Sequence, residues 1–386
     1  MRKKRITGAL ALLAAAFIVC AIVPGKAFAA KEPYRIGGIF SITGPSSFLG
    51  DPEKKTMEMV IEQINAKGGV DGHMLEAVIY DDEGDPTKAV LAANKLTSKD
   101  GVLAIVGPSL TPTTLAIIPV TEKAGVPLVS CAAGIKITEP VKPLVYKTAQ
   151  NDVLAVGAIY RHMQSANIKK IAIITVETAY GESGKEQLTG QASKFGLQIV
   201  QAETFGAKDT DMTAQLAKIR AAQPEALVCW GTNPGPAVIA RNVVQMNMKV
   251  PLYQSHGVAS PKFIELAEAA AENILLPTGK ILVAEQLPAT DPQKKVLTDY
   301  ITEFEKRFSM PVGGFGGYAH DGVHLLAIAL KGTDGDKKKI AENLGKIKGF
   351  IGITGSFTFT PEDHNGLGPD AFVMVQIKNG KWQLLK

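Results

Sequence analysis

Short apolar runs alternate with helix-spaced apolar residues from residue 35 onward. Residues 35–40 form an apolar run typical of a buried strand, and residues 57, 60, 61 and 64 are apolar at helical steps. The same alternation predicts further strands at 75–80, 102–106 and 126–129 and helices at 89–96 and 112–123. This pattern is typical of a parallel sheet that is covered by helices.

The alternation restarts near Lys170, which indicates a second sheet. It predicts strands at 170–175, 197–203, 226–230 and 251–253 and helices at 184–195, 212–222 and 236–246. After residues 281–283 helices are predicted at 293–308, 318–330 and 336–347, and then strands at 356–359, 371–377 and 382–385. Asn379-Gly380 is a hairpin signal between the last two strands. We therefore predict an α/β fold of two lobes, 30–149 with 280–366 and 150–279 with 367–386.

The N-terminus has the three parts of a secretory signal peptide. Residues 2–5 are basic, residues 8–23 are apolar, and residues 27–29 read Ala-Phe-Ala, which predicts cleavage after Ala29. A membrane anchor is an alternative, but the apolar run is short for a span and ends at Pro24. A lipoprotein modified at Cys20 is a third reading, which the bulky Val19 disfavours.

Removal of this segment changes the net charge of the chain. The whole chain of 386 residues has 42 basic and 37 acidic residues, and five of the basic ones precede residue 30. The remaining body is neutral, which argues against nucleic acid as a partner. Only Cys131 and Cys229 remain in it. Both lie in or beside apolar strand-like runs, so two buried thiols are favoured over a bridge.

Motifs for catalysis or metal binding are weak in this chain. No Gly-x-Ser-x-Gly occurs, and no glycine fingerprint follows the first strand. His320 and His324 share a helix face and suit zinc, but no third ligand is evident, so an ordinary helix with His320 facing a cleft is favoured. The acidic residues at 81–85 lack the spacing of a calcium loop and indicate a solvated turn. We therefore expect no metal, no cofactor and no enzymatic activity.

Binding chemistry is better represented, at the carboxyl ends of the predicted strands. Sites in parallel sheets lie there, and the loops to inspect are 41–50, 107–114, 130–136, 176–182, 231–235 and 254–260. Thr111 suits a helix cap and Pro112 the first helical position, and the free N–H groups of such a helix start hold a carboxylate. Small residues at 130–134 allow a ligand to touch the backbone. The alternatives are a plain cap and an ordinary tight loop.

Several motifs resemble those of the periplasmic branched-chain amino-acid-binding proteins. They are IGGIFSITGP at 36–45, INAKGGV at 64–70, YDD at 80–82 with DP at 85–86, AYG at 179–181 and DMTAQL at 211–216. The resemblance spans nearly the whole mature chain. It implies a type I fold, in which two doubly wound parallel-sheet lobes are joined by three crossings of the chain. The two lobes close over a ligand. It also implies a monomeric periplasmic receptor that delivers a small carboxylate to the membrane permease of an ABC importer.

The resemblance also implies which residues contact the ligand. The carboxylate site falls on Thr111 and on the loop from Ala132 to Gly134. The family's other positions fall on Phe48 and Leu49 for the side-chain pocket, on Tyr180, Thr232 and His256 in the second lobe, and on Tyr318 in a segment that looks like relatives binding aromatic or apolar acids.

The chain departs from the family at several of these positions. Gly134 replaces a hydroxyl residue, Thr232 replaces a common aromatic, and His256 replaces the acid that grips the ligand's ammonium. The positions of a first-lobe disulfide fall on Gly84 and Leu110. We therefore expect a ligand without an α-ammonium. The alternative is that Glu177 or Glu182 beside Tyr180 grips an ammonium instead.

Two other functions fit parts of the sequence. A ligand sensor on the same fold would dock to a signalling protein instead of a permease. A secreted metal-dependent hydrolase would use His320 and His324.

Overall fold

A computed structural model describes residues 31–385 of the chain. The expected signal peptide, its cleavage after Ala29 and the possible modification at Cys20 lie outside the described residues. Within the described part, none of the helices combines the length and the apolar character needed to cross a membrane.

The first sheet has five parallel strands in the order β2-β1-β3-β4-β5. Helices connect most of these strands, as expected for parallel pairs. The strands are β1 Tyr34–Phe40, β2 Leu75–Asp81, β3 Ala104–Val106, β4 Leu128–Ser130 and β5 Val145–Lys147, and the connections contain α1 Ser47–Asn65, α2 Pro86–Ser98, α3 Thr111–Ala124 and the short helix η1 Ile135–Ile137.

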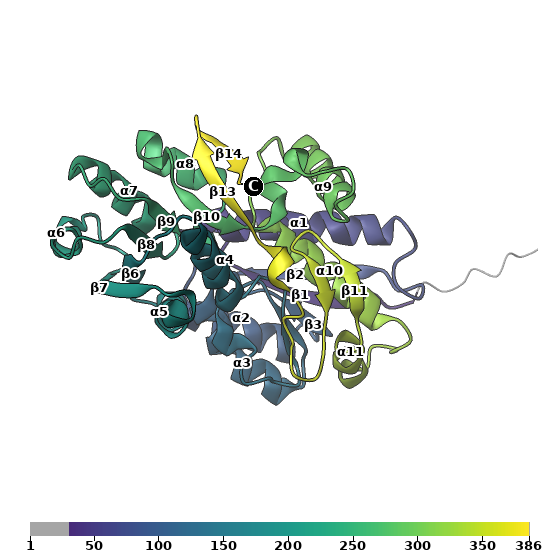
Figure 1. The fold of residues 1–386 in the computed structure, drawn as a ribbon. Coiled ribbons are helices and arrows are strands. Elements are labelled where there is room, and N and C mark those ends of the chain that lie inside the picture. Colours follow the sequence, from purple (N-terminus) through teal and green to yellow (C-terminus); the bar gives the residue numbers. More distant parts are fainter. Residues whose placement is uncertain (1–30, 386) are drawn as a thin grey trace, which may run out of the picture.

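The second sheet has seven strands in the order β14-β13-β10-β9-β8-β6-β7. Its parallel part is β6 Lys170–Val176, β7 Gln198–Phe205, β8 Ala226–Trp230, β9 Leu252–Gln254 and β10 Leu275–Thr278. The helices of this part are α4 Asp152–Ser165, α5 Ala179–Ala192, η2 Ser193–Phe195, α6 Thr213–Ala221, α7 Gly235–Gln245, η3 His256–Val258, α8 Pro261–Ala267 and η4 Glu268–Ala271. Figure 1 shows this sheet beside the first one, with α4 between β10 and the viewer.

The last hairpin returns to the second sheet from far along the chain. Strand β13, Val373–Lys378, pairs antiparallel with β10, and β14, Lys381–Leu384, pairs antiparallel with β13. Asn379 and Gly380 both have positive φ, 51° and 68°, as a two-residue hairpin turn of this type requires. The hairpin predicted from the Asn-Gly pair is confirmed.

The elements between β10 and β13 belong mostly to the first sheet's side of the molecule. They are η5 Lys280–Gln286, α9 Lys294–Phe308, α10 Gly316–Leu330, α11 Lys337–Leu344, the antiparallel pair β11 Lys348–Ile351 and β12 Ser356–Thr358, and η6 Pro369–Ala371. Helix α10 is buried over most of its length and shares one apolar cluster with α1, β1 and β3. The chain thus leaves the first lobe, returns to it and leaves it again.

Three connections therefore join the two lobes. A buried side-chain amide in the first connection forms hydrogen bonds to backbone carbonyls from later parts of the chain. The side chain of Gln150, between β5 and α4, donates from Nε2 to the carbonyls of Thr354 at 3.0 Å and Ala371 at 3.1 Å. The two-lobe α/β fold that we predicted is the observed one. The residue-level division at 149/150, 279/280 and 366/367 stays a prediction.

Several elements were missed in the sequence. Helix α4 is buried through most of its length, so its apolar residues show no clear one-sided period. Strands β5 and β10 have three and four residues, too few for an alternation to be visible. Helix α5 begins at Ala179, five residues before the predicted 184, because Thr178 caps it by accepting from the Gly181 N–H.

Candidate ligand-binding cleft

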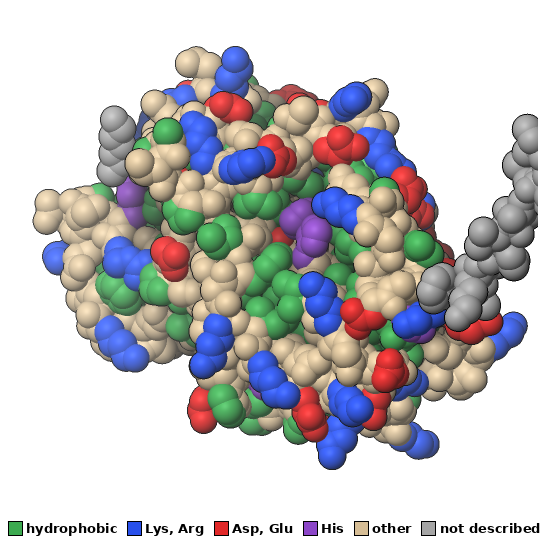
Figure 2. All heavy atoms as spheres, turned by 90° about the vertical axis from the view of Figure 1, so that its right-hand side faces the viewer, with side chains coloured by type: hydrophobic (Ala, Val, Ile, Leu, Met, Phe, Trp, Pro, Cys, Tyr) green, Lys and Arg blue, Asp and Glu red, His purple; other side chains and the backbone are tan. Residues whose placement is uncertain are grey.

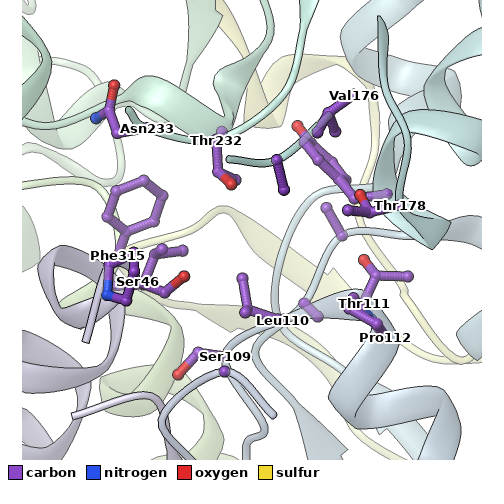
Figure 3. A pocket seen from close by; sticks show the side chains of 18 of the residues that line it. Ser46, Ser109, Leu110, Thr111, Pro112, Val176, Thr178, Thr232, Asn233 and Phe315 are labelled. Carbon is purple, nitrogen blue, oxygen red and sulfur yellow. The ribbon is translucent and has the colours of Figure 1, made fainter. Parts of the chain in front are cut away.

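Loops from the carboxyl ends of both sheets enclose a cavity of about 510 Å³. The first lobe contributes loops after β1, β2, β3 and β4, and the second lobe contributes loops after β6, β7, β8 and β9. Figure 3 shows Ser109, Leu110 and Thr111 on one side of this cavity and Thr232 and Asn233 on the other. A concave, mostly apolar space between two lobes is a typical position for a small-molecule site.

Seven of the nine residues that we named from the sequence line this cavity. They are Leu49, Thr111, Ala132, Tyr180, Thr232, His256 and Tyr318. Phe48 and Gly134 do not line it. The Phe48 ring packs edge-on against Phe315, which does line the cavity, with 5.6 Å between ring centres. Gly134 lies behind Thr111 and donates its N–H to Thr111 Oγ1 at 3.1 Å.

The start of α3 differs by one residue from our expectation. The capping position is Leu110, whose side chain accepts no bond, so Thr111 is the first helical residue and not the cap. The first N–H groups of a helix have no carbonyl partner within it. Pro112 has no N–H, and the Thr114 N–H donates to the Leu110 carbonyl. The N–H groups of Thr111 and Thr113 and the positive end of the helix dipole therefore remain available to an anion.

The Thr111 hydroxyl is oriented by the next loop. Its oxygen accepts the Gly134 N–H, so its own proton is free to be donated into the cleft. A Cβ at position 134 would lie 2.4 Å from Thr111 Cγ2, a distance at which Thr111 has to move. Gly134 is therefore the residue that permits this close approach to Thr111.

The opposite wall carries His256 in a buried and apolar setting. The side chain is 3% exposed, and its ring packs edge-on against Tyr180, Trp230 and Phe372. Burial, together with the charge of Lys147, lowers the pKa of His256 to about 3, so the imidazole is neutral at physiological pH. Neither ring nitrogen has a hydrogen-bond partner among residues 31–385, and neither does the Tyr180 hydroxyl.

The acids near this wall do not reach the cavity. Asp152 lies behind His256, with 4.0 Å between Asp152 Oδ1 and His256 Nε2, and burial raises its pKa to about 7. Glu177 and Glu182, which we considered as alternative partners for an ammonium, are exposed and do not line the cavity. At the first-lobe rim, Glu83 is paired with Lys88 at 2.6 Å.

Other lining residues were missed in the sequence. Ser46, Ser109 and Asn233 lie in loops that we had marked, but nothing in a single sequence separated them from their neighbours. Residues 83–86 after β2 and Ala207-Lys208 after β7 were not marked, although the rule that marked the other loops applies to them. The acidic turn was described as solvated, yet Asp82 is fully buried and accepts from the Ser41 hydroxyl.

His320 and His324 lie away from the cleft. They line a separate hollow of about 330 Å³ between α1, α9, α10 and β11, on the face where Figure 2 shows histidine among apolar side chains. His320 Nδ1 is 2.9 Å from Asp321 Oδ1, and Asp321 also accepts the N–H groups of Ile353 and Thr354. The expectation that His320 faces the cleft is therefore wrong. Across the described residues, no three potential metal ligands of the His, Cys, Asp or Glu type gather.

The cysteine positions agree with buried thiols. Cys131 and Cys229 are both free and buried, and they lie in different apolar clusters of the two lobes. A Cβ on Gly84 would lie 3.3 Å from Leu110 Cδ1, so the two positions to which the resemblance assigned a disulfide are neighbours.

Comparisons with known proteins place the chain in a family. The profile of the family described as "Periplasmic binding protein" matches residues 33–381. The Leucine-, isoleucine-, valine-, threonine-, and alanine-binding protein of Pseudomonas aeruginosa is 28% identical over 318 residues, or 82% of this chain and 83% of that protein.

Solved structures agree with this match. An extracellular ligand-binding receptor from Rhodopseudomonas palustris HaA2 has a TM-score of 0.85 and 28% identity, covering 92% of this chain and 99% of that one. The substrate binding protein LivJ of Streptococcus pneumoniae, in complex with isoleucine, has a TM-score of 0.81 and 26% identity over 92% and 99% of the two chains. The resemblance drawn from the motifs is confirmed, and the chain belongs to the periplasmic binding protein family, with branched-chain amino-acid-binding proteins among its relatives.

Proposed function

We propose that this protein is the extracytoplasmic substrate-binding receptor of an ABC importer of the branched-chain amino-acid type. It works as a monomer in the periplasm after removal of its signal peptide, without catalysing a reaction. It captures a small carboxylate between its lobes and presents the closed form to the membrane permease. Family membership and the names of the relatives support this proposal.

The carboxylate of the ligand lies at the start of α3. The observation that supports this placement most strongly is the combination of an uncapped helix start with a Thr111 hydroxyl whose proton is free. The Ala133 N–H in the adjoining loop also has no acceptor among residues 31–385, and Ala133 lines the cavity. Hydroxyl and amide donors of this kind stabilise a carboxylate by charge-assisted hydrogen bonds.

The rest of the ligand is apolar and has no α-ammonium. A buried ammonium requires a carboxylate partner, since an unpaired buried charge is costly. Neutral His256 does not supply that charge, and Asp152 behind it does not line the cavity. Leu49, Leu110 and Phe315 line the space that remains, which suits a branched or aromatic side chain.

A thermal-shift screen tests this function with matched pairs of ligands. The pairs are leucine with 4-methylpentanoate, valine with 3-methylbutanoate, and phenylalanine with 3-phenylpropanoate. A ligand at about 100 times its dissociation constant stabilises the protein by about 2.7 kcal/mol, which is readily measured. We expect stabilisation by at least one acid without nitrogen and none by its amino-acid partner. Stabilisation by the amino acids alone would restore the usual ligands of the relatives.

A further inference from the structure

A buried lysine lies directly behind the proposed carboxylate site. Lys147, the last residue of β5, is fully buried, and its Nζ donates to the carbonyl oxygens of Ala133 at 2.7 Å and Gly134 at 3.4 Å. These two carbonyls belong to the peptide groups whose N–H groups are those of Gly134 and Ile135. The Lys147 ammonium thus polarises two consecutive peptide groups of the loop after β4.

The first of these peptide groups leads to the cleft. The Gly134 N–H, on the far side of the peptide from the Ala133 carbonyl, donates to Thr111 Oγ1 at 3.1 Å. A donor that is polarised at its carbonyl end donates more strongly, because hydrogen bonds in a chain reinforce one another at low dielectric. The Thr111 oxygen is thereby held as an acceptor from the loop, and its proton is directed to another acceptor.

The second peptide group leads to the other lobe. The Ile135 N–H donates to Ser183 Oγ at 3.2 Å, and the Ser183 hydroxyl in turn donates to the carboxylate of Asp152. Ser183 lies on α5 and Asp152 begins α4, so this chain crosses from the loop of the first lobe into the second lobe. All of these side chains are buried.

We propose that Lys147 is a positioning residue for the carboxylate site, acting through two hydrogen-bond chains. One chain makes Thr111 a donor to the ligand, and the other joins the same loop to the second lobe through Ser183 and Asp152. This inference rests on the proposed function, because it assumes a carboxylate at Thr111. It adds a cation that does not touch the ligand, yet raises the affinity of the site for an anion.

The charge of Lys147 depends on its surroundings. The charged groups that act on it are Asp152 on α4, Glu139 after η1 and Asp363 after β12, and Lys147 itself acts on neutral His256. Burial lowers the pKa of Lys147 to about 8. As the pH rises through this value the lysine loses its proton, and the affinity for a carboxylate should fall.

Nuclear magnetic resonance of the unmodified protein gives a test that needs no ligand. The backbone amide signals of Gly134 and Ile135 should titrate together near pH 8, while the signal of exposed Gly196 in the other lobe stays constant. Loss of the proton from Lys147 weakens both donors, so the Gly134 amide proton should shift upfield with rising pH. Ionisation of Asp152, which Ile135 reaches through Ser183, adds an opposite shift to the Ile135 signal only. Constant signals of Gly134 and Ile135 between pH 7 and pH 9.5 would overturn the proposal.

A double-mutant cycle gives the second test, with 4-methylpentanoate as the probe and its amide as the neutral counterpart. Lys147→Met should weaken binding of the acid by about tenfold and binding of the amide by less than about twofold. In a Thr111→Val background the same change should cost the acid less than about twofold, since the chain is already broken. Equal losses in both backgrounds would contradict the proposal.

The matched control is Lys142, which also donates to carbonyls of this loop. Its Nζ bonds Lys136 O, Ile137 O and Pro140 O, none of which leads to Thr111. Lys142→Met should leave the preference for acid over amide unchanged, and Lys147→Arg should restore part of it. If the unmodified protein binds no acid, the proposed ligand class is wrong. The pH titration of the backbone N–H signals of Gly134 and Ile135 then still decides the role of Lys147. The same pH titration of the unmodified protein decides the role of Lys147 if Lys147→Met does not fold.

Discussion

At the residue scale, we expect single side chains to decide which ligand this cleft accepts. Thr111 has a hydroxyl proton that is free to be donated, Gly134 leaves room for Thr111, and His256 is neutral at the opposite wall. Each of these effects depends on one residue type at one place. A change at any of them should therefore alter ligand binding more than it alters the fold.

The hydroxyl of Thr111 is the most direct target. A hydrogen bond to a charged group is worth about 1.5–3 kcal/mol, so Thr111→Val should weaken binding of 4-methylpentanoate by about tenfold or more. Thr121 is the control, because it is buried on the same helix and its hydroxyl bonds only to the Ile118 carbonyl. Unchanged affinity of Thr111→Val in calorimetry would remove this residue from the site.

A buried acid beside the cleft should make stability depend on pH. Glu53 is fully buried, it accepts from the hydroxyl of Ser109, and burial raises its pKa well above the ordinary 4.5. The folded protein keeps this proton while the unfolded chain releases it, so the wild type loses stability as the pH rises above about 4.5. Glu53→Gln has no such loss.

The melting temperature of Glu53→Gln relative to the wild type should therefore increase from pH 5 to pH 8. Exposed Glu342 provides the matched control, and Glu342→Gln should show a constant difference over the same range. A difference for Glu53→Gln that is constant or decreases with pH would mean that the folded protein holds Glu53 ionised.

The sequence predicted only part of the site at this scale. Thr111 was found because it stands at a predicted helix start after a strand, whereas Tyr180 and His256 were named from the family resemblance. The contact of Gly134 with Thr111 joins residues 23 positions apart, and the one from Lys147 to Ala133 joins residues 14 apart. Such contacts depend on side-chain packing in three dimensions, which a single sequence does not display.

Among the elements, α3 is the one whose start we propose as the site of the ligand's carboxylate. Its first position outside the helix is Leu110, which lines the cavity and gives the helix no side-chain cap. An Asp at this position would accept the N–H of Thr113 and place a carboxylate where we expect the ligand's own.

Leu110→Asp should therefore be more stable than Leu110→Ala by about 1 kcal/mol in the absence of ligand. It should also bind 4-methylpentanoate more weakly than Leu110→Ala, since both variants lose the leucine side chain and only one blocks the helix start. Denaturant unfolding and calorimetry measure the two effects. Equal binding by the two variants would mean that the ligand does not use this helix end.

Elements with a clear period or a compact apolar run between polar or turn residues were predicted well, and the shortest strands and a helix buried over most of its length were not. Strand β8 was predicted at its observed bounds, Ala226–Trp230, because a compact apolar run lies between polar residues. Helix α4 and strands β5 and β10 were missed, although α4 begins at Asp152 and β5 ends at Lys147, the residues at the two ends of the hydrogen-bond chain.

At the scale of the whole molecule, a hydrogen bond and an ion pair join the two lobes beside the cleft. Beside the partly buried Ile135–Ser183 bond, an exposed ion pair joins Lys136 and Glu186 at 2.6 Å. An exposed pair of this kind contributes about 0–1 kcal/mol and adds little to the contact between the lobes.

We expect the lobes to separate without ligand and to close with it. Small-angle scattering should show a smaller radius of gyration in the presence of 4-methylpentanoate than in its absence. The same addition to Thr111→Val, at a concentration that saturates only the wild type, should leave the profile unchanged. Identical profiles of the wild type with and without ligand would argue against closure.

The two-lobe plan itself was accessible from sequence. The restart of the strand–helix alternation near Lys170 and the late hairpin at Asn379-Gly380 correspond to the two observed sheets and to the return of β13 and β14. Which loops of the two lobes meet across the cleft depends on how the three connections orient the lobes, and no local pattern records that orientation.

The central claim is that the cleft selects a carboxylate without an α-ammonium. The most direct measurement is a calorimetric competition between 4-methylpentanoate and leucine, which differ only in the ammonium group. We predict that 4-methylpentanoate binds with measurable heat and that excess leucine does not displace it. Displacement by leucine, or tight binding of leucine with no binding of the acid, would contradict the account and assign the ammonium a partner in this cleft.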